Sequence, residues 1–414
     1  DGSDGLIACG SYTGDGTTNG TKEINLGWEP QTILIKNASV SGTGWIMTDV
    51  MMGIPTSPFG TYDRHILKPN TSDAEYASAD YFNVTSTGFR LTSNNSQVNA
   101  SGSNYIYIAI RRGPMSKPTS GTEVFDVSNG SSVPSFDFPP DFILTTDTGS
   151  GYTGETFDRL RGNGKVLRTN SSSAEGSVAY GNFNHDGRQN TWGNNWGNTR
   201  YFIHGFKRAP SVFDVVAYQG DGSTNRSLKH NLGVTPEMIW VKARTGYTYG
   251  WYTYDATNGA GGRMRIDDNG GFNADTSAFA NTAPTETDFR VGATYTNGSS
   301  GTFVAYLFAT LPGVSKVGSY TGNGSSQVID CGFTTSARFV LIKRSDNNSN
   351  WNLFDSFRGI TVSSSPEQYL NQLAAQTVNN FIEPDSSGFL VNYNSVNDND
   401  VNINGATYIF FAIS

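Results

Sequence analysis

Charged residues are scarce in this chain of 414 residues, because Asp, Glu, Lys and Arg make up 15% of it, against about 25% in an average soluble protein. The net charge is −8, and Lys and Arg never cluster in more than two adjacent positions. A nucleic-acid-binding protein needs a basic face that displaces counterions, so we predict no such partner. The chain also lacks an apolar run of about 18–20 residues, the length that spans a bilayer, and we expect no membrane insertion.

Cysteine and histidine are nearly absent as well. Two cysteines, Cys9 and Cys331, cannot form a disulfide framework, and we expect both to be small, buried, apolar residues. The four histidines lack the spacing of metal ligands, and we expect His204, inside a short apolar strand, to be half-buried. We therefore predict no metal site and no cofactor.

Aromatic residues, in contrast, are abundant: the chain has 25 Phe, 20 Tyr and 7 Trp. They provide enough apolar surface to build cores in a chain that is otherwise rich in Ser, Thr, Asn and Gly. The strong helix formers Ala, Leu, Glu, Lys and Arg are few. This composition predicts an all-β protein.

One sequence pattern recurs four times at the spacing of a domain. It begins near a Gly-Asp-Gly or Gly-Asn-Gly turn and ends in a strand of β-branched and aromatic residues, and it is clear in three copies and weak in the second. The pattern predicts four domains, which we call repeats 1 to 4: residues 1–115, 116–210, 211–314 and 315–414.

Each repeat is predicted to be a two-layer antiparallel sandwich of roughly eight strands, so the expected fold is four tandem β-sandwiches of jelly-roll or lectin-like type. We interpret the turn at Gly14–Gly16 as a tight hairpin between two alternating strands. The apolar run Ile33–Lys36 reads as a central strand buried on both faces. Short junctions that contain Pro would line the sandwiches up as a stiff rod.

A Trp-x-x-x-Asp motif recurs in repeats 1, 3 and 4, at Trp45–Asp49, Trp251–Asp255 and Trp351–Asp355. A carboxylate site is one interpretation. A catalytic site is rarely needed in every copy, however, so we favour a core Trp followed by an Asp–Arg pair that pins a turn. Repeats 2 and 4 carry such pairs as Asp158-Arg-Leu-Arg161 and Asp355-Ser-Phe-Arg358.

The Gly-Asp-Gly loops have two interpretations. Asp15 and Asp221 could ligate calcium together with loop carbonyls. Asn323 replaces the carboxylate in repeat 4, which favours a purely structural turn.

One segment of repeat 2 departs from the shared pattern, because it places Trp192 and Trp196 among Gly and Asn residues. Indole faces stack on sugar rings while amides such as Asn194 and Asn195 bind the hydroxyls. These four residues are therefore our candidate sugar contacts. The alternative is that one or both tryptophans fill the core of this smaller domain.

The amino-acid sequence of repeat 4 resembles that of a known family. The resemblance rests on four segments: Ser315–Ser326, Phe339–Arg344, Trp-x-x-x-Asp-Ser-x-Arg-Gly-Ile from Trp351, and Tyr408–Ser414. They are similar to the repeated β-domain of virion structural proteins of marine tailed bacteriophages. The resemblance extends over essentially the whole chain, although repeat 2 lacks two of the motifs. It implies a tail fibre, spike or similar surface protein, commonly a trimer, and supplies no catalytic residue.

We therefore predict a non-enzymatic structural protein on the exterior of a phage particle, part of a tail fibre or spike that contacts the host surface, with other virion proteins and copies of itself as partners. The alternatives are a capsid decoration or head-fibre protein, and a carbohydrate-binding, lectin-like adhesin of a bacterial surface. A glycoside hydrolase would need two carboxylates facing each other across a groove. The non-repeated acids Asp186, Asp214 and Glu383 have no evident partner in the sequence.

Overall fold

A computed structural model of the chain describes residues 5–18, 20–50, 66–76, 81–113, 116–129, 136–149, 154–183, 189–191, 200–393 and 401–414. The described secondary structure is almost entirely antiparallel β-strand, with one short 3-10 helix, η2 (Gly121–Glu123). The all-β prediction is confirmed. Each described sheet combines strands of one repeat only, whereas the exact domain boundaries stay a prediction.

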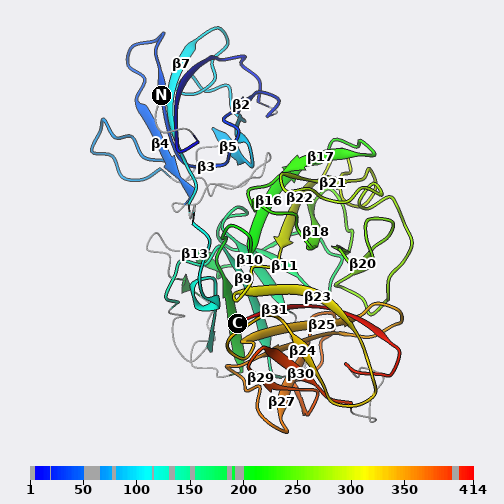
Figure 1. Ribbon diagram of the computed structural model, residues 1–414. Coiled ribbons are helices and arrows are strands. Elements are labelled where there is room, and N and C mark those ends of the chain that lie inside the picture. The colour runs from blue at the N-terminus through cyan, green and yellow to red at the C-terminus, as the bar shows by residue number, and fades with distance from the viewer. Residues whose placement is uncertain are drawn as a thin grey trace.

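Repeat 1 forms the separate lobe at the top of Figure 1 and has two sheets. The four-stranded sheet has the order β1-β7-β3-β4: β1 (Ile7–Thr13), β7 (Asn104–Arg111), β3 (Pro30–Asn37) and β4 (Trp45–Asp49). The three-stranded sheet has the order β2-β6-β5: β2 (Glu23–Asn25), β6 (Gly88–Leu91) and β5 (Phe82–Thr85).

Repeats 3 and 4 repeat this plan. In repeat 3 the large sheet consists of β16 (Phe213–Gln219), β22 (Thr302–Phe308), β18 (Met238–Thr245), β19 (Trp251–Asp255) and β20 (Met264–Arg265), and the small one of β17 (Arg226–Lys229) and β21 (Asp288–Val291). In repeat 4 the large sheet consists of β23 (Ser315–Thr321), β31 (Thr407–Ile413), β25 (Phe339–Arg344), β26 (Trp351–Asp355), β27 (Ser365–Tyr369) and β28 (Thr377–Asn379), and the small one of β24 (Gln327–Asp330), β30 (Gly388–Val391) and β29 (Ile382–Asp385).

Repeat 2 keeps the large sheet and differs in the small one. Its large sheet consists of β12 (Gly176–Ser177), β11 (Lys165–Arg168), β10 (Glu155–Asp158), β9 (Phe142–Asp147), β15 (Tyr201–Phe206) and β8 (Phe125–Asn129). A two-stranded sheet of β13 (Asn182–Phe183) and β14 (Gln189–Thr191) accompanies it.

The register makes the four repeats comparable residue by residue. In each large sheet the closing strand lies between the opening strand and the long second strand, as β7 lies between β1 and β3. The last apolar residue of the closing strand pairs with an equivalent residue each time: Ile110 with Thr32, Phe206 with Phe142, Phe308 with Met238, and Ile413 with Phe339. Because side chains alternate across a strand, these pairs identify the same face in every repeat.

The Gly-Asp-Gly turn does not close a hairpin, contrary to the sequence prediction. Strand β1 before it pairs with β7, and strand β2 after it pairs with β6 of the other sheet. The loop therefore carries the chain from one layer to the other. The second glycine has a positive φ, +72° at Gly16, which explains why the loop needs glycine there.

Each repeat has a core of its own between its layers, and repeats 2, 3 and 4 also share one. The shared core lies between the outer faces of their large sheets. Three ring pairs connect repeats 2 and 3, repeats 2 and 4, and repeats 3 and 4: Phe142 with Phe213, Phe125 with Phe339, and Phe308 with Phe411. Because each repeat packs on the other two, the three form a closed ring.

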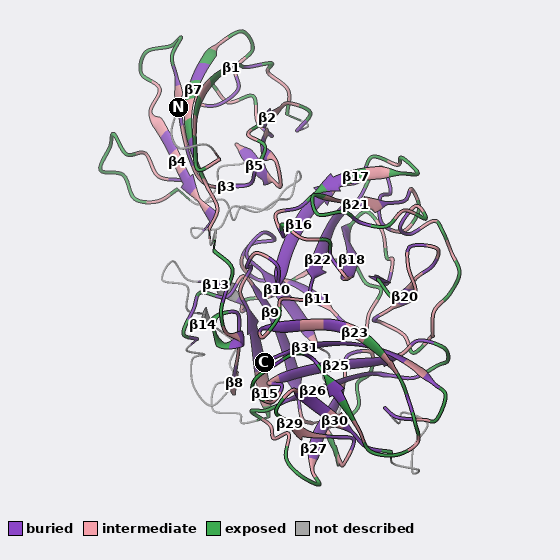
Figure 2. Cartoon of the chain, viewed as in Figure 1, coloured by how far each residue is buried: buried purple, intermediate pink, exposed green. Residues whose placement is uncertain are grey.

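This ring overturns the prediction of a stiff rod. The junctions between repeats 2, 3 and 4 are tight turns, bridged from Ala209 to Phe213 and from Leu311 to Ser315. Such short connections bring successive large sheets together, and burial of their aromatic faces holds them there. Figure 2 shows β16, β22 and β31 as mostly buried strands of this ring.

Repeat 1 is the exception, and two predictions fail in it. Cys9 is exposed on β1, although Cys331 is buried as expected. The long strand β3 is buried on one face only and partly exposed on the other, whereas its counterparts β9, β18 and β25 are buried on both faces over most of their length. The physical reason is that no other described repeat covers the outer face of the large sheet of repeat 1.

Candidate functional site

The four candidate sugar contacts, Trp192, Trp196, Asn194 and Asn195, lie outside the described residues, as does Asp186. Sugar binding by this segment stays a prediction.

The Trp-x-x-x-Asp motif holds the ring of repeats together. The indole nitrogen of Trp251 donates a hydrogen bond to the carbonyl oxygen of Arg168 in repeat 2, at 2.8 Å. The equivalent atom of Trp351 donates to the carbonyl oxygen of Arg265 in repeat 3, at 2.7 Å. Both indoles are buried, and both acceptors occupy the same strand position. One contact is thus used twice around the ring.

The aspartate of this motif, which repeat 2 keeps as Asp158 although it lacks the Trp, lies at the next point of contact. In repeat 2, Asp158 accepts hydrogen bonds from its own Arg161 and from the Tyr306 hydroxyl of repeat 3, the latter at 2.7 Å. All three side chains are completely buried. Burial of the hydroxyl, more than the neighbouring charges, raises the pKa of Tyr306 well above its usual range, so the hydroxyl stays a donor.

The aspartate of repeat 4 is contacted by a histidine of repeat 2, at the position from which a tyrosine of repeat 3 contacts the aspartate of repeat 2. Asp355 forms an ion pair with Arg358, and its Oδ2 atom lies 3.0 Å from Nε2 of His204 in repeat 2. Burial alone would raise the pKa of Asp355, but Arg358 and His204 outweigh it and hold that pKa well below its usual value. His204 is completely buried rather than half-buried as predicted, because the ring covers the face on which it lies.

Repeat 3 breaks this pattern. Asp255 accepts hydrogen bonds from the backbone and side-chain nitrogens of Asn258, at 2.9 Å each. Asn258 stands where repeats 2 and 4 have arginine, and no cation pairs with Asp255 among the described residues. Burial therefore raises the pKa of Asp255.

The Gly-Asp-Gly loops have their acceptor oxygens engaged by neighbouring donors. Oδ1 of Asp15 accepts hydrogen bonds from Thr17 and from the Asn99 amide, at 2.8–3.0 Å. In repeat 4 the Asn323 side-chain oxygen accepts equivalent bonds from Ser325 and Asn402. Since a neutral amide makes the same contacts, the geometry favours a turn. In the part of the chain that the structure describes, no group of three or more His, Cys, Asp or Glu side chains is arranged to hold a metal ion.

The other acids named from the sequence also have partners. Asp214 is buried and forms an ion pair with Arg208, whose Nε atom lies 2.7 Å from Oδ1 of Asp214. Arg208 also binds both carboxylate oxygens of Glu29 in repeat 1, at 2.6 and 2.7 Å. Glu383 accepts a hydrogen bond from Asn392 at 3.0 Å. Asp214 therefore belongs to the junction that joins repeat 1 to the ring.

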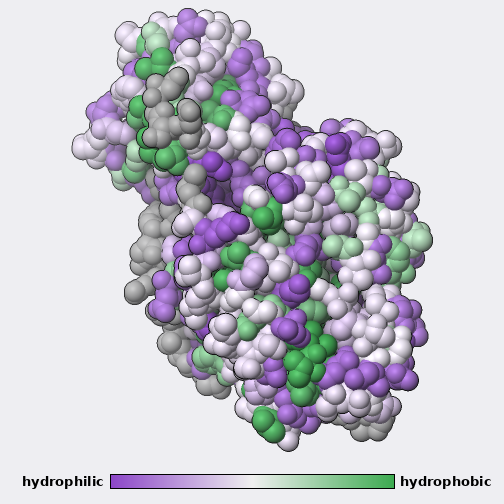
Figure 3. All heavy atoms as spheres, in the orientation of Figure 1, coloured by the Kyte–Doolittle hydropathy of each residue, from purple (hydrophilic) through white to green (hydrophobic). Residues whose placement is uncertain are grey.

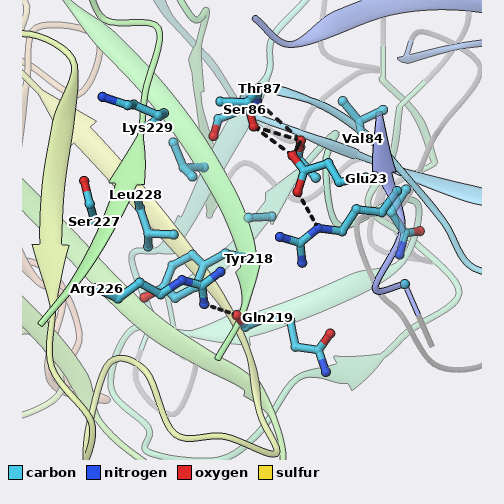
Figure 4. Close-up of a pocket in the computed structure, with 16 residues that line it drawn as sticks. Glu23, Val84, Ser86, Thr87, Tyr218, Gln219, Arg226, Ser227, Leu228 and Lys229 are labelled. Atoms are coloured by element: carbon cyan, nitrogen blue, oxygen red, sulfur yellow. Dashed lines mark hydrogen bonds and ion pairs between the residues drawn. The ribbon is translucent and has the colours of Figure 1, made fainter. Parts of the chain in front are cut away.

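A cleft opens between repeats 1 and 3, with a volume of about 150 Å³. Figure 4 shows Glu23, Ser86 and Thr87 of repeat 1 facing Tyr218, Gln219 and Arg226 of repeat 3. No local sequence pattern reveals this cleft, because its two walls are separated by more than a hundred residues along the chain.

The charged groups that line the cleft are already engaged. Glu23 forms an ion pair with Arg90 at 2.9 Å and accepts hydrogen bonds from two threonine hydroxyls. Arg226 forms an ion pair with Asp221, and Lys229 with Asp288. Glu23 is the one carboxylate of the described lining. The cleft can hold water or a small polar molecule, but its lining does not offer the facing pair of carboxylates that glycoside hydrolysis uses.

No helix in the described residues is long and apolar enough to span a membrane. A search of curated proteins finds no match to this chain. A family model, described as a domain of unknown function (DUF7483), matches residues 2–114 and 207–414. The stretch that it leaves unmatched nearly coincides with repeat 2, which is also the most divergent repeat in sequence. Because the matched residues are well over half of the chain, the protein belongs to the DUF7483 family.

Proposed function

We propose that this chain is a non-enzymatic structural protein of a bacteriophage particle, carried on the particle exterior as part of a tail fibre or spike. One observation carries the non-enzymatic part. The polar residues that recur between repeats are used to join the repeats, as Trp251, Trp351 and the Asp158–Tyr306 pair illustrate. Assembly of β-domains is the role that such a motif serves best. The phage setting rests on the sequence resemblance.

The surroundings of the acids support the same proposal. Asp214 is neutralised by Arg208 inside a buried network, and Glu23 is engaged by Arg90. A general acid or nucleophile needs an accessible carboxyl group within reach of a bound substrate. Asp214 is buried, and Glu23, which lines the cleft, has no second carboxylate facing it among the described lining residues.

We propose that repeat 2 makes the contact with the host. We propose that Trp192 and Trp196, with Asn194 and Asn195, bind a host surface glycan by ring stacking and amide hydrogen bonds. Replacing both tryptophans by Ala should abolish binding to host cells or purified host glycan, while circular dichroism stays unchanged. Unaltered binding by the folded double variant would remove this part of the proposal.

Immunogold electron microscopy of purified particles, with antibody raised against this chain, tests the location. Label on the tail supports a fibre or spike. Label on the capsid would replace it by a decoration or head-fibre protein. Particles without label would overturn the virion assignment and favour the bacterial adhesin.

A depolymerisation assay on host polysaccharide tests the non-enzymatic part. We expect no cleavage. Reproducible cleavage that is lost in Asp186→Asn or Glu383→Gln would contradict the proposal, with Val328→Asp, an exposed position elsewhere, as the matched control.

A further inference from the structure

The outer face of the large sheet of repeat 1 is apolar and exposed. Ile106, Ile108 and Ile110 alternate along the central strand β7, and each is 40–44% exposed. Ile7 and Cys9 lie beside them on β1 and are also exposed. We call this surface the isoleucine face. Figure 3 shows hydrophobic residues in green on the surface of this lobe.

The same face is buried in every other repeat. The equivalents of Ile110 are Phe206, Phe308 and Ile413, which are 1–3% exposed. The equivalents of Ile108 are His204, Tyr306 and Phe411, which are at most 1% exposed. Each of those repeats buries this face against two others. The isoleucine face is therefore the one large-sheet face in the described structure without such partners.

Repeat 1 also carries the tryptophan whose counterparts in repeats 3 and 4 bond to a neighbouring repeat. The backbone nitrogen of Trp45 donates to the side chain of Asn70, as that of Trp251 does to Asp267. The Trp45 side chain, however, is partly exposed, and its indole nitrogen has no hydrogen-bond partner among the described residues. In repeats 3 and 4 that indole donates to a carbonyl of a neighbouring repeat.

The acceptor for such a bond is present in repeat 1. Met47 pairs with Leu67 as Thr253 pairs with Met264, so Lys68 occupies the position of Arg265. The carbonyl oxygen of Lys68 accepts from the Thr71 nitrogen at 2.9 Å and from the Thr71 hydroxyl at 3.3 Å. The carbonyl oxygen of Arg168, at the same position in repeat 2, accepts from Ser171 in addition to Trp251. An indole donor at the Lys68 oxygen would therefore replace the longer of its two bonds, the one from the Thr71 hydroxyl.

We propose that the isoleucine face is a homotrimer interface, in which repeat 1 of three chains forms the ring that repeats 2, 3 and 4 form within one chain. Trp45 of each chain donates to Lys68 of the next, and the isoleucines of the three copies meet at the centre. A dimer would supply only one partner repeat and would leave part of the ring open. Three identical faces close it, and a closed heterologous ring is a favoured form of oligomer.

The rest of each chain leaves room for this arrangement. Strand β5 and its neighbours in the small sheet of repeat 1 face β16 and β17 across the cleft. In Figure 1, β5 lies on the side of the lobe nearest to these strands. Repeat 3 therefore lies beside the layer opposite to the isoleucine face. This inference does not depend on the proposed phage function.

Sedimentation velocity or native mass spectrometry of the full chain tests the proposal. We expect a mass three times the 44.7 kDa of one chain. Ile108→Asp should lower it threefold to that of the monomer, because three carboxylates would meet at the centre of the ring. Val328→Asp, which changes an exposed strand residue of repeat 4, is the matched control and should stay trimeric.

The two cysteines report on folding and assembly in the same samples. Cys9 lies on the isoleucine face and Cys331 is buried in repeat 4. A thiol reagent should modify neither in the wild-type trimer and Cys9 alone in the folded Ile108→Asp monomer. A wild-type monomer with Cys9 freely modified, a dimer, or a trimer that survives Ile108→Asp would each overturn the proposal.

Discussion

The same substitution at one motif position should cost much more stability in one repeat than in another. Asp355 and Asp255 both end the Trp-x-x-x-Asp motif and both are at most 2% exposed. Asp355 has Arg358 and His204 as partners, whereas Asp255 has only hydrogen bonds from Asn258 and its surroundings. We therefore compare Asp355→Asn with Asp255→Asn.

The expected losses of stability follow from what each substitution leaves behind. Asp355→Asn leaves the Arg358 side chain, 1% exposed, without a counter-ion. Breaking a buried pair in this way costs about 3–5 kcal/mol. Asp255→Asn removes a carboxylate whose charged form is already disfavoured by burial, and the amide keeps its shape and one acceptor. We expect a change of about 1 kcal/mol or less.

The dependence on pH should differ in sign as well. The pKa of Asp355 is lowered on folding, so its stabilising contribution is complete above the unfolded pKa of about 3.9 and disappears as the pH falls below that value. The pKa of Asp255 is raised. Its charged form is therefore destabilising at neutral pH, and this cost is relieved as the pH falls towards the unfolded pKa.

Urea unfolding at neutral pH, followed by circular dichroism and evaluated by linear extrapolation, measures both losses. The pH series on the wild type and on each variant then separates the two slopes. Equal losses at the two positions would refute the reasoning, because it assigns the difference to Arg358 and His204, the partners of Asp355. A loss below about 1 kcal/mol for Asp355→Asn would refute it too, since a surface ion pair has that value.

Three further predictions concern the Trp351 hydrogen bond, the buried Cys331 thiol and the Asp15 turn. Trp351→Phe removes the indole donor to Arg265 and should lower the free energy of unfolding by about 1–3 kcal/mol, measured in the same urea experiment; a negligible change would mean that this bond does not hold the ring. Cys331 is buried, and that burial raises its pKa to about 12, so it should resist a thiol reagent at about pH 8 until the protein unfolds. Asp15→Asn should change stability by less than about 0.5 kcal/mol, because Asn323 makes the same turn in repeat 4; a melting temperature that rises with added calcium in the wild type, and no longer in the variant, would instead support an ion site.

Much of the fold was predictable because it depends on local patterns. Strands such as β31 and β22 are short runs of β-branched and aromatic residues, and the all-β composition excluded helices as the main element. The positive φ of Gly16 was implied by a glycine at a recurring turn position. The pairing of Asp158 with Arg161 followed from their spacing.

The candidate sites were less predictable, because they depend on distant contacts. His204 and Asp355 are separated by 151 positions in the sequence, and the walls of the cleft come from repeats 1 and 3. Hydrophobic alternation does not predict that Cys9 is exposed. A strand shows the same alternation whether or not another repeat covers the outer face of its sheet.

The sequence by itself determined that the chain is all-β, that a domain-sized pattern recurs in it, and that the recurring Asp and Arg residues lie close enough to pair. These features follow from side-chain alternation and turn chemistry, which act over a few residues. Only the tertiary structure decided that repeats 2, 3 and 4 close into a ring while repeat 1 leaves its isoleucine face open. The reason is physical: the choice between a row and a ring depends on which apolar faces can meet, and short junctions with large aromatic side chains allow that meeting in three of the four repeats.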